Sequence, residues 1–303
     1  MERITDVYQQ VTDEIIAAVE EGCIPWIRPW RDGEPVFPVN AALNRAYNGI
    51  NIPLLWRSAD RNGFEHDRWL TFRQALNVGG NVRKGEKSTL AVLYLPQERE
   101  EKDKNGEPLF DSNGQPKKQH FALLRTFRLF NLEQCDGLPQ AWKQPVIQVS
   151  APVEAAEAVI SHSGVPVVHR RQQRAYYYPH RDVIVMPHPE QFDNADEYYG
   201  TLLHEITHAT GHLTRLAREG ITSENKTFGD PVYAFEELVA EMGSAFICAQ
   251  TGIRANLQHA GYIESWLRVL RNDKRAIIRA SGLARNACEW LLERVNQPVQ
   301  ITA

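Results

Sequence analysis

Two histidines with a glutamate between them are the first feature of this sequence that could do chemistry. They lie in the segment TLLHEITHATGHLTRL, in which Glu205 directly follows His204 and His208 comes one helical turn later. On an α-helix, side chains four residues apart lie on one face, so His204 and His208 can point their imidazoles at one metal ion. Glu205 projects about 100° around the helix from His204. It is therefore poorly placed as a ligand, but it can act as a general base toward a water molecule at the site.

This arrangement is the H-E-x-x-H pattern, in which two histidines bind zinc and the glutamate is the base. The alternative is a chance match on an ordinary helix, because short motifs also occur without a metal. The third ligand decides the subclass. The metzincin continuation keeps its glycine at Gly211 but has Thr214 where its third histidine should stand, which argues against that class. We expect Gly211 to end the helix, so we interpret His212 as a cap or as a residue that supports a ligand.

The third ligand is predicted in the downstream segment DPVYAFEELVAEMGSAF. An aspartate and a proline are suited to begin a helix there, and Gly252 is suited to stop it. Glu237 and Glu241 share one face of this helix beside an apolar stripe, so that face turns partly inward. Buried carboxylates need partners, and a zinc site with Glu237 as ligand and Glu241 holding a histidine satisfies both. The alternative is that Glu236, Glu237 and Glu241 are solvated surface acids.

The elements that must position these groups follow from local signals. Asp193 or Asn194 can cap the helix that carries the histidines, and acidic residues suit its first turn. The segment from residue 172 to 192 is typical of two strands around a turn at Pro179 and His180, in a region that is otherwise helical from about residue 150. In a zinc peptidase, a strand beside the metal helix can pair with an extended substrate chain.

The first half of the chain has a different organisation. An amphipathic, acidic helix is predicted for about residues 2–21. A short helix, a glycine turn and a strand are predicted for residues 69–96. A polar hairpin extension is predicted for residues 97–120, and a returning strand for residues 121–135. A passage with several prolines then separates this half from the metal helices. The sequence therefore predicts an α+β protein with two domains, residues 1–145 and residues 150–303.

Bulk properties limit the possible partners. The chain has 303 residues and a net charge of −4, so a global positive field for nucleic acid is absent and any such binding must use a local surface. No apolar stretch reaches the roughly 18 residues of a membrane span, and the first helix is not a signal peptide. The 4 cysteines are far apart and form no CxxC motif, which is typical of reduced thiols in a cytoplasmic protein.

Aromatic and basic residues gather in the first 90 residues. Single-stranded nucleic acid is bound by aromatic platforms along a positive groove. Composition alone favours a plainer interpretation, with the tryptophans in the core and the arginines on the surface, because aromatic side chains are mostly buried.

Several motifs, in order, resemble the ArdC antirestriction family. The segments GCIPWIRPW, NRAYNGIN and GGNVRKGEKSTLAVLY are similar to its N-terminal module, which is shared with TraC-type plasmid primases. The segments DVIVMPHPEQF, YYGTLLHEITHATGHLTRLAR and YAFEELVAEMGSAFI are similar to its C-terminal zincin-like metallopeptidase domain, and HAGYIESWLRVLRNDKRAIIRASGLA resembles its closing helices. The likeness covers nearly the whole chain.

The resemblance implies a plasmid-borne protein with a single-stranded DNA-binding N-domain and a metallopeptidase-like C-domain. Its role would be to protect incoming DNA from host restriction during conjugation, with an unknown protein substrate for which the host restriction system is a candidate. The resemblance also reverses the interpretation of the aromatic and basic cluster. The candidates for DNA contact are Trp26, Arg28, Trp30, Arg45, Tyr47, Arg83, Lys84 and Lys87.

The predicted centre is gluzincin-like and holds Zn²⁺ or another divalent metal such as Mn²⁺. Its ligands are His204, His208 and Glu237. Glu205 is the base that takes a proton from water and passes it to the leaving amine, and Glu241 and His212 support the ligands.

Two points stay open from the sequence. The group that stabilises the oxyanion can be Tyr233, His212 or Tyr262. The alternative function is a non-catalytic single-stranded DNA-binding protein whose metal site is structural or vestigial, since an intact motif shows capacity and not turnover.

Overall fold

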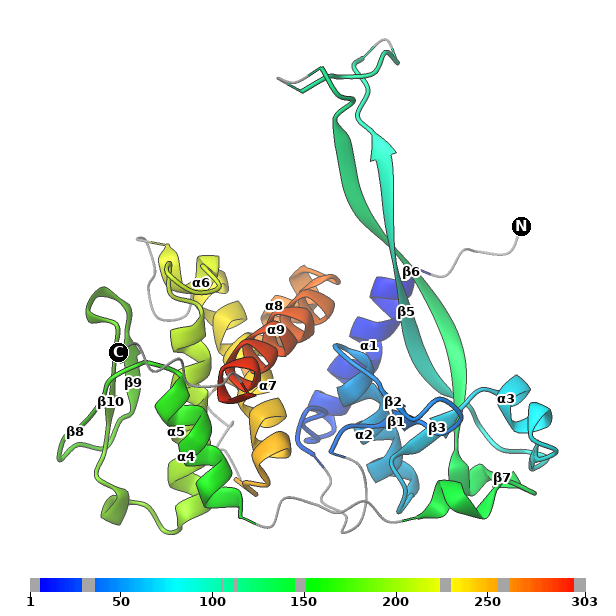
Figure 1. The fold of residues 1–303 in the computed structure, drawn as a ribbon, viewed down its shortest axis with the longest axis horizontal. Helices are drawn as coiled ribbons and strands as arrows, with labels where there is room; N and C mark the ends of the chain where they lie inside the picture. The colour runs from blue at the N-terminus through cyan, green and yellow to red at the C-terminus, as the bar shows by residue number, and fades with distance from the viewer. Residues whose placement is uncertain are drawn as a thin grey trace, which may run out of the picture.

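The structure is a computed structural model that describes residues 6–28, 36–104, 106–111, 114–144, 151–223, 230–255 and 262–296. An α+β first half carries a long two-stranded arm, and a mostly helical second half carries a small sheet (Figure 1). The predicted fold class is confirmed.

The first half is built on a five-stranded sheet with the order β2-β1-β3-β6-β5. Its strands are β1 (Val39–Asn40), β2 (Arg45–Ala46), β3 (Arg68–Leu70), β5 (Thr89–Glu100) and β6 (Lys118–Asn131). β5 pairs antiparallel along its whole length with residues 118–129 of β6, and the two strands project from the body as the arm (Figure 1). The predicted hairpin extension is the outer part of this arm.

Short elements complete the first half. Its helices are α1 (Val7–Glu20), α2 (Asn51–Asn62) and α3 (Phe72–Asn77). A separate two-stranded sheet pairs β4 (Asn81–Val82) with β7 (Cys135–Asp136), and the 3-10 turns are η1 (Leu132–Gln134) and η2 (Gln140–Lys143).

The second half is a helical body with a three-stranded sheet at its edge. Its helices are α4 (Pro152–His162), α5 (Ala195–Thr210), α6 (Glu219–Thr222), α7 (Pro231–Thr251), α8 (Ile263–Asn272) and α9 (Ala276–Asn296). Its strands are β8 (Val167–His169), β9 (Tyr176–Tyr178) and β10 (Val183–Met186), with the 3-10 turns η3 (Pro179–Arg181) and η4 (Pro189–Gln191). β10 lies between the other two strands, antiparallel to β9 and parallel to β8. The two strands predicted around Pro179 are present, and the sequence missed β8.

The predicted boundaries of the two metal-site helices match the structure, whereas α1, predicted for about residues 2–21, is Val7–Glu20, and residues 1–5 lie outside the described part. The Asn194 side chain accepts a hydrogen bond from the backbone of α5, which ends at Gly211. The Asp230 side chain caps α7, and Gly252 ends it with a positive φ of 86°, a conformation that glycine adopts without strain. Local capping chemistry therefore sets where both metal-site helices begin and end.

The two halves share one hydrophobic core. Trp26 packs edge-on against Trp266 of α8 with 5.3 Å between ring centroids, and Phe37 packs in the same way against Phe246 of α7 at 5.8 Å. Thr12 of α1 donates a hydrogen bond to a backbone carbonyl beyond α8. The predicted division into residues 1–145 and 150–303 stays a prediction, and residues 145–150 lie outside the described part.

The helices and the cysteines can be compared with the expectations for membrane spans and thiols. Within the described ranges, no helix is both long enough and apolar enough to cross a membrane. All 4 cysteines are free thiols, and 3 of them are buried.

Candidate metal centre

A close approach of α5 and α7 brings the predicted ligands together. A Cβ atom added at Gly243 of α7 would lie 2.4 Å from Cγ2 of Thr207 on α5, so the helices can pack this closely only because position 243 has no side chain. The Ser244 hydroxyl donates a hydrogen bond across the same interface to the carbonyl of Gly200 at 3.2 Å. The facing turns of the two helices are thereby held side by side.

Three side chains converge at this interface in a geometry that suits a metal ion. The Nε2 atoms of His204 and His208 are 3.2 Å apart, and each lies 3.5 Å from a carboxylate oxygen of Glu237. Tetrahedral ligands at about 2.0–2.1 Å from zinc are about 3.3 Å from one another, so the spacing fits such an ion. Among the residues that the structure describes, this is the one group of three potential ligand side chains that converges in this way.

A second carboxylate faces the outer nitrogen of each histidine. His204 Nδ1 lies 3.9 Å from Glu241, and His208 Nδ1 lies 3.4 Å from Glu236. Such partners fix the ring orientation of a ligand histidine and increase its basicity. Glu241 was predicted to hold a histidine and lies near His204, but at 3.9 Å it is beyond hydrogen-bond distance, and the approach of Glu236 to His208 was not foreseen.

Glu236 is a buried member of the site, only 3% exposed, and not a solvated acid. Arg218 donates to its carboxylate through Nη2 at 2.6 Å and also to Thr210 Oγ1 at 2.6 Å, which ties α7 to the end of α5. Gly220 leaves room for this arrangement, because an added Cβ would lie 2.5 Å from Glu236 Cβ. The sequence carried a weak signal, since Glu236 projects about 100° from Glu237 on the helix.

The carboxylates control the charge of the histidines. Burial opposes a positive charge on His208, but Glu237 and Glu236 outweigh it and raise the pKa of His208 to about 10. Burial likewise opposes the charge on His204, and Glu237 and Glu241 raise its pKa above the ordinary value. Burial opposes the negative charge of Glu237, yet the two histidines hold its pKa well below the usual range. Without metal, the cluster is therefore a network of ion pairs at neutral pH.

Metal binding is expected to release a proton at neutral pH. A ligand histidine must be neutral, whereas the raised pKa keeps His208 protonated in the metal-free protein up to about pH 10. The apparent affinity should therefore rise with pH, by about tenfold per pH unit for each displaced proton. Calorimetric titrations with Zn²⁺ in buffers of different ionisation enthalpy measure the release directly. Equal heats in all buffers at pH 7 would contradict the expectation.

Glu205 lies between the histidines and the sheet. It is 8% exposed, and its Oε2 accepts a hydrogen bond of 2.7 Å from the backbone N–H of Tyr177 in β9. This contact places the edge of β9 beside the ligands. The cleft there has a volume of about 360 Å³, and its lining includes Tyr176, Glu205, Tyr233 and Tyr262. The predicted strand beside the metal helix is thus present.

Two of the three candidates for the oxyanion donor line this cleft. Burial, followed by the nearby carboxylate of Glu237, raises the pKa of both Tyr233 and Tyr262, so both hydroxyls stay protonated and can donate hydrogen bonds. His212 lies elsewhere, in the turn after α5, where Nδ1 lies 2.9 Å from Thr214 Oγ1. It is not among the residues that line the cleft.

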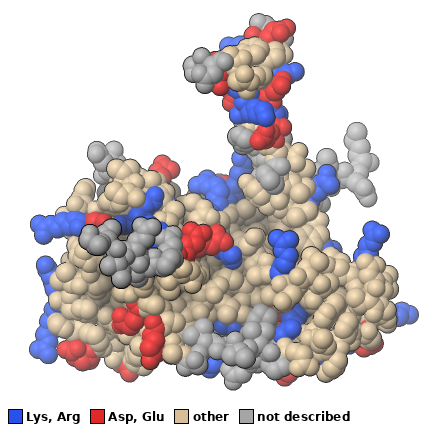
Figure 2. All heavy atoms as spheres, viewed as in Figure 1, with Lys and Arg blue, Asp and Glu red and all other residues tan. Residues whose placement is uncertain are grey.

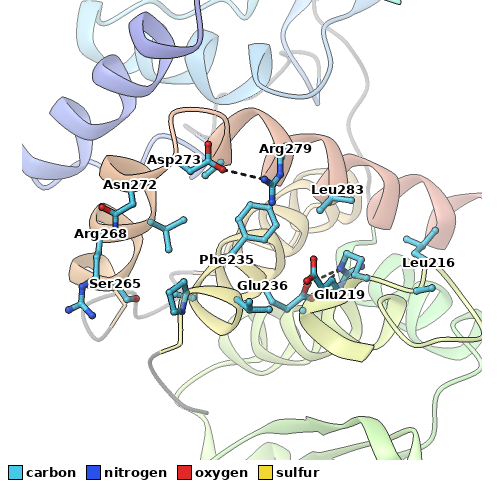
Figure 3. A pocket seen from close by; sticks show the side chains of 18 residues that line it. Leu216, Glu219, Phe235, Glu236, Ser265, Arg268, Asn272, Asp273, Arg279 and Leu283 are labelled. Atoms are coloured by element: carbon cyan, nitrogen blue, oxygen red, sulfur yellow. Dashed lines mark hydrogen bonds and ion pairs between the residues drawn. The ribbon is translucent and has the colours of Figure 1, made fainter. Parts of the chain in front are cut away.

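A more apolar cavity of about 480 Å³ lies behind the site, between the loop after α5 and helices α7, α8 and α9. Phe235 contributes to its wall with the guanidinium of Arg279 over its ring, and Asp273 pairs with that guanidinium at 3.2 Å (Figure 3). Gly220 and Glu236 line both this cavity and the metal cleft, so Glu236 forms part of the wall between them.

The residues predicted to contact DNA do not form one surface. Trp26 is 0% and Arg28 is 5% exposed, so neither can meet a DNA strand in this structure, and these two predictions are corrected. Both are covered by the second half of the chain, since Trp26 packs against Trp266 and Arg28 donates to the carbonyl of Ala249. Trp30 lies outside the described residues.

The other five candidates divide into two regions. Arg83, Lys84 and Lys87 are exposed around the loop between β4 and β5, where Arg83 pairs with Glu86 at 2.8 Å. Arg45 and Tyr47 line a separate groove of about 690 Å³.

Two family models match successive parts of this chain. A family model of zincin-like metallopeptidases matches residues 154–283. A family model of the N-terminal domain of the anti-restriction factor ArdC matches residues 5–130.

Similar proteins cover both halves together. Two crystal structures of the antirestriction protein ArdC from plasmid R388 are similar to 96% of this chain, each with a TM-score of 0.76. The metal-free structure is 37% identical in sequence, and the match covers 98% of its chain. The Mn(II)-bound structure is 35% identical, and the match covers 99% of its chain. An uncharacterized protein y4eC of Sinorhizobium fredii is 37% identical over 95% of this chain and 92% of its own. The DNA primase TraC of Escherichia coli is 36% identical over 99% of this chain, but the match spans only 21% of that primase.

Proposed function

This chain belongs to the ArdC antirestriction family, and from that premise we propose that it binds single-stranded DNA and carries a metallopeptidase site. We propose that this site helps to protect incoming DNA from host restriction during conjugation. The observation that carries the peptidase part is the convergence of two Nε2 atoms and the Glu237 carboxylate beside Glu205. We expect the protein to act in the cytoplasm.

The centre is suited to a divalent metal, and we propose Zn²⁺, with Mn²⁺ as the ion seen in the similar R388 protein. When bound, such an ion polarises a carbonyl and lowers the pKa of water at the site toward about 7. Glu205 is placed to accept the proton from that water and to deliver it to the leaving amine. Tyr233 or Tyr262 donates a hydrogen bond to the oxyanion.

The substrate is proposed to be an extended polypeptide. An edge strand beside a catalytic centre can pair with the backbone of such a chain. β9 lies at the edge of its sheet, and the hydrogen bond from Tyr177 to Glu205 fixes it next to the base. A protein of the host restriction system is the first candidate.

DNA binding is expected to favour single strands over duplex and to show little sequence preference, because every base has a face that can stack. The affinity should fall by at least about tenfold between 50 and 200 mM salt, as expected when about three phosphate contacts release counterions. Fluorescence anisotropy with a labelled oligo-dT strand and a duplex of equal length measures both effects. Equal affinity for the duplex, or no dependence on salt, would refute the binding mode.

A further inference from the structure

We infer that the single-stranded DNA lies in a groove built by both halves of the molecule, between the base of the arm and helix α9. The inference rests on the proposed DNA binding and assigns its place. It also makes a helix of the metallopeptidase half part of the DNA site.

The groove has one wall from each half. The first wall is formed by β2, the turn before α2 and the inner ends of β5 and β6, and it includes Arg45, Tyr47 and Tyr94. The second wall is one face of α9, with Gly282, Arg285 and Asn286. α9 lies on the side of the helical half that faces the sheet and the arm (Figure 1). The enclosed volume of about 690 Å³ exceeds that of the metal cleft, about 360 Å³, and is large enough for a nucleotide.

Large apolar and aromatic side chains are exposed along the first wall. Tyr94 is 63%, Leu43 is 61% and Leu93 is 46% exposed. Apolar side chains that gather on a surface mark an interaction site. The exposed ring of Tyr94 suits bases, which stack on aromatic rings without regard to sequence, whereas Tyr47 packs partly against the core of the first half.

The charged groups of the groove suit a strand with few phosphates inside it. Arg45 is exposed on the first wall, where it can meet a phosphate. Arg285 on the second wall lies over the Phe37 ring at 5.4 Å and donates through Nε to Glu289 at 2.7 Å. Its Nη1 atom is buried and has no hydrogen-bond partner among the described residues, so we expect the guanidinium to turn toward an oxygen of a base or phosphate when the groove is occupied.

The charge inside the groove limits where the phosphates of a bound strand can lie. Glu289 also lines the groove and partly neutralises Arg285, so we expect the phosphates at the rim and the bases in the interior. Seen from this face, the surface between the helical half and the base of the arm is largely uncharged, with Lys and Arg side chains at several points of its border and Asp or Glu side chains at another (Figure 2). Bases inside and phosphates at the rim match that distribution.

Gly282 provides a test that fills the groove without removing a contact. A Cβ atom added there meets nothing within 4 Å, and the residue lies inside α9, where alanine is a better helix former than glycine. G282W should obstruct the groove and weaken binding to labelled oligo-dT by at least about tenfold. G282A is the matched control and should bind within about twofold of the wild type. Circular dichroism and Zn²⁺ affinity of both variants should be unchanged.

A second pair tests the aromatic wall from the other half. Tyr94→Ala should weaken oligo-dT binding by about fivefold or more, the usual cost of losing one stacked base, whereas Tyr94→Phe should retain it. This pair also decides the matter if G282W does not fold.

The outcomes separate the inference from the proposed function. If the wild type binds single strands and both G282W and Tyr94→Ala bind equally well, the groove is not the DNA site, although DNA binding itself stands. Such a result would leave the groove to an apolar segment of a protein partner. If the full-length wild type does not bind single strands at all, the proposed DNA-binding function fails.

Discussion

Replacing Glu205 by Gln is expected to lower peptide hydrolysis by about 10²–10⁴-fold while leaving the fold and metal affinity close to those of the wild type. The amide keeps the size of the side chain and an oxygen that can accept the hydrogen bond from the Tyr177 backbone, but it cannot take a proton from water. The Zn²⁺-loaded protein can be assayed with fluorescently labelled casein as a general substrate, and metal content can be measured on the same samples.

Glu190→Gln is a suitable control, because the Glu190 side chain is 70% exposed and lies outside the metal cleft. It should cleave casein like the wild type. If Glu205→Gln cleaves as fast as the control, Glu205 is not the base.

Plasmid transfer into a restricting host tests the biological role of the same change. If peptide cleavage contributes to protection, Glu205→Gln should lower the transfer frequency while DNA binding stays unchanged. Full protection by this variant would support the non-catalytic alternative, in which DNA coating alone evades restriction and the metal site is structural.

Replacing Glu237 by Gln is expected to cause the largest loss of metal affinity, more than about 100-fold. Glu237 is 3% exposed and lies 3.5 Å from Nε2 of both histidines, so its carboxylate is the only anionic member of the predicted ligand set. Titration of Zn²⁺ against a chromophoric chelator measures the affinity.

Glu241→Gln is the matched control for this change. It is one turn away on the same helix and faces the outer nitrogen of His204 at 3.9 Å, so its loss should cost about 10–100-fold. If Glu241→Gln loses more affinity than Glu237→Gln, the assignment of ligand and supporting residue must be exchanged.

The metal centre was largely predictable because its information is local. Helical periodicity places His204 and His208 on one face of α5, and it places Glu237 and Glu241 on one face of α7. Caps such as Asn194 fix where the helices begin. The sequence therefore predicted a geometry that the structure reproduces at 3.2–3.5 Å between donor atoms.

The support for the centre was less predictable because it depends on how distant turns pack. Arg218 reaches Glu236 only because the loop after α5 folds back over α7, and Gly220 permits their contact. The sequence of the helix alone cannot show that Glu236, which is next to the ligand Glu237, is buried. β8 was missed for a related reason, since it pairs in parallel with β10 and no turn in the sequence joins the two strands, unlike β9 and β10.

The DNA surface was the least predictable part. The sequence predicted one cluster of aromatic and basic residues, but Trp26 is buried against α8, and only packing between the halves decides this. The same packing brings α9 opposite Tyr47 and Tyr94. No signal within either half could indicate that surface, because its two walls are separated by at least 150 residues of chain.

The central claim is that one divalent ion is held by His204, His208 and Glu237. Its most direct test is a crystal structure of the protein soaked with Zn²⁺, with diffraction data collected on both sides of the zinc absorption edge. We expect one anomalous peak at about 2.0–2.1 Å from Nε2 of both histidines and about 2.0–2.2 Å from an oxygen of Glu237. A peak at another position, or a bound ion from which the Glu237 carboxylate has turned away, would contradict the claim.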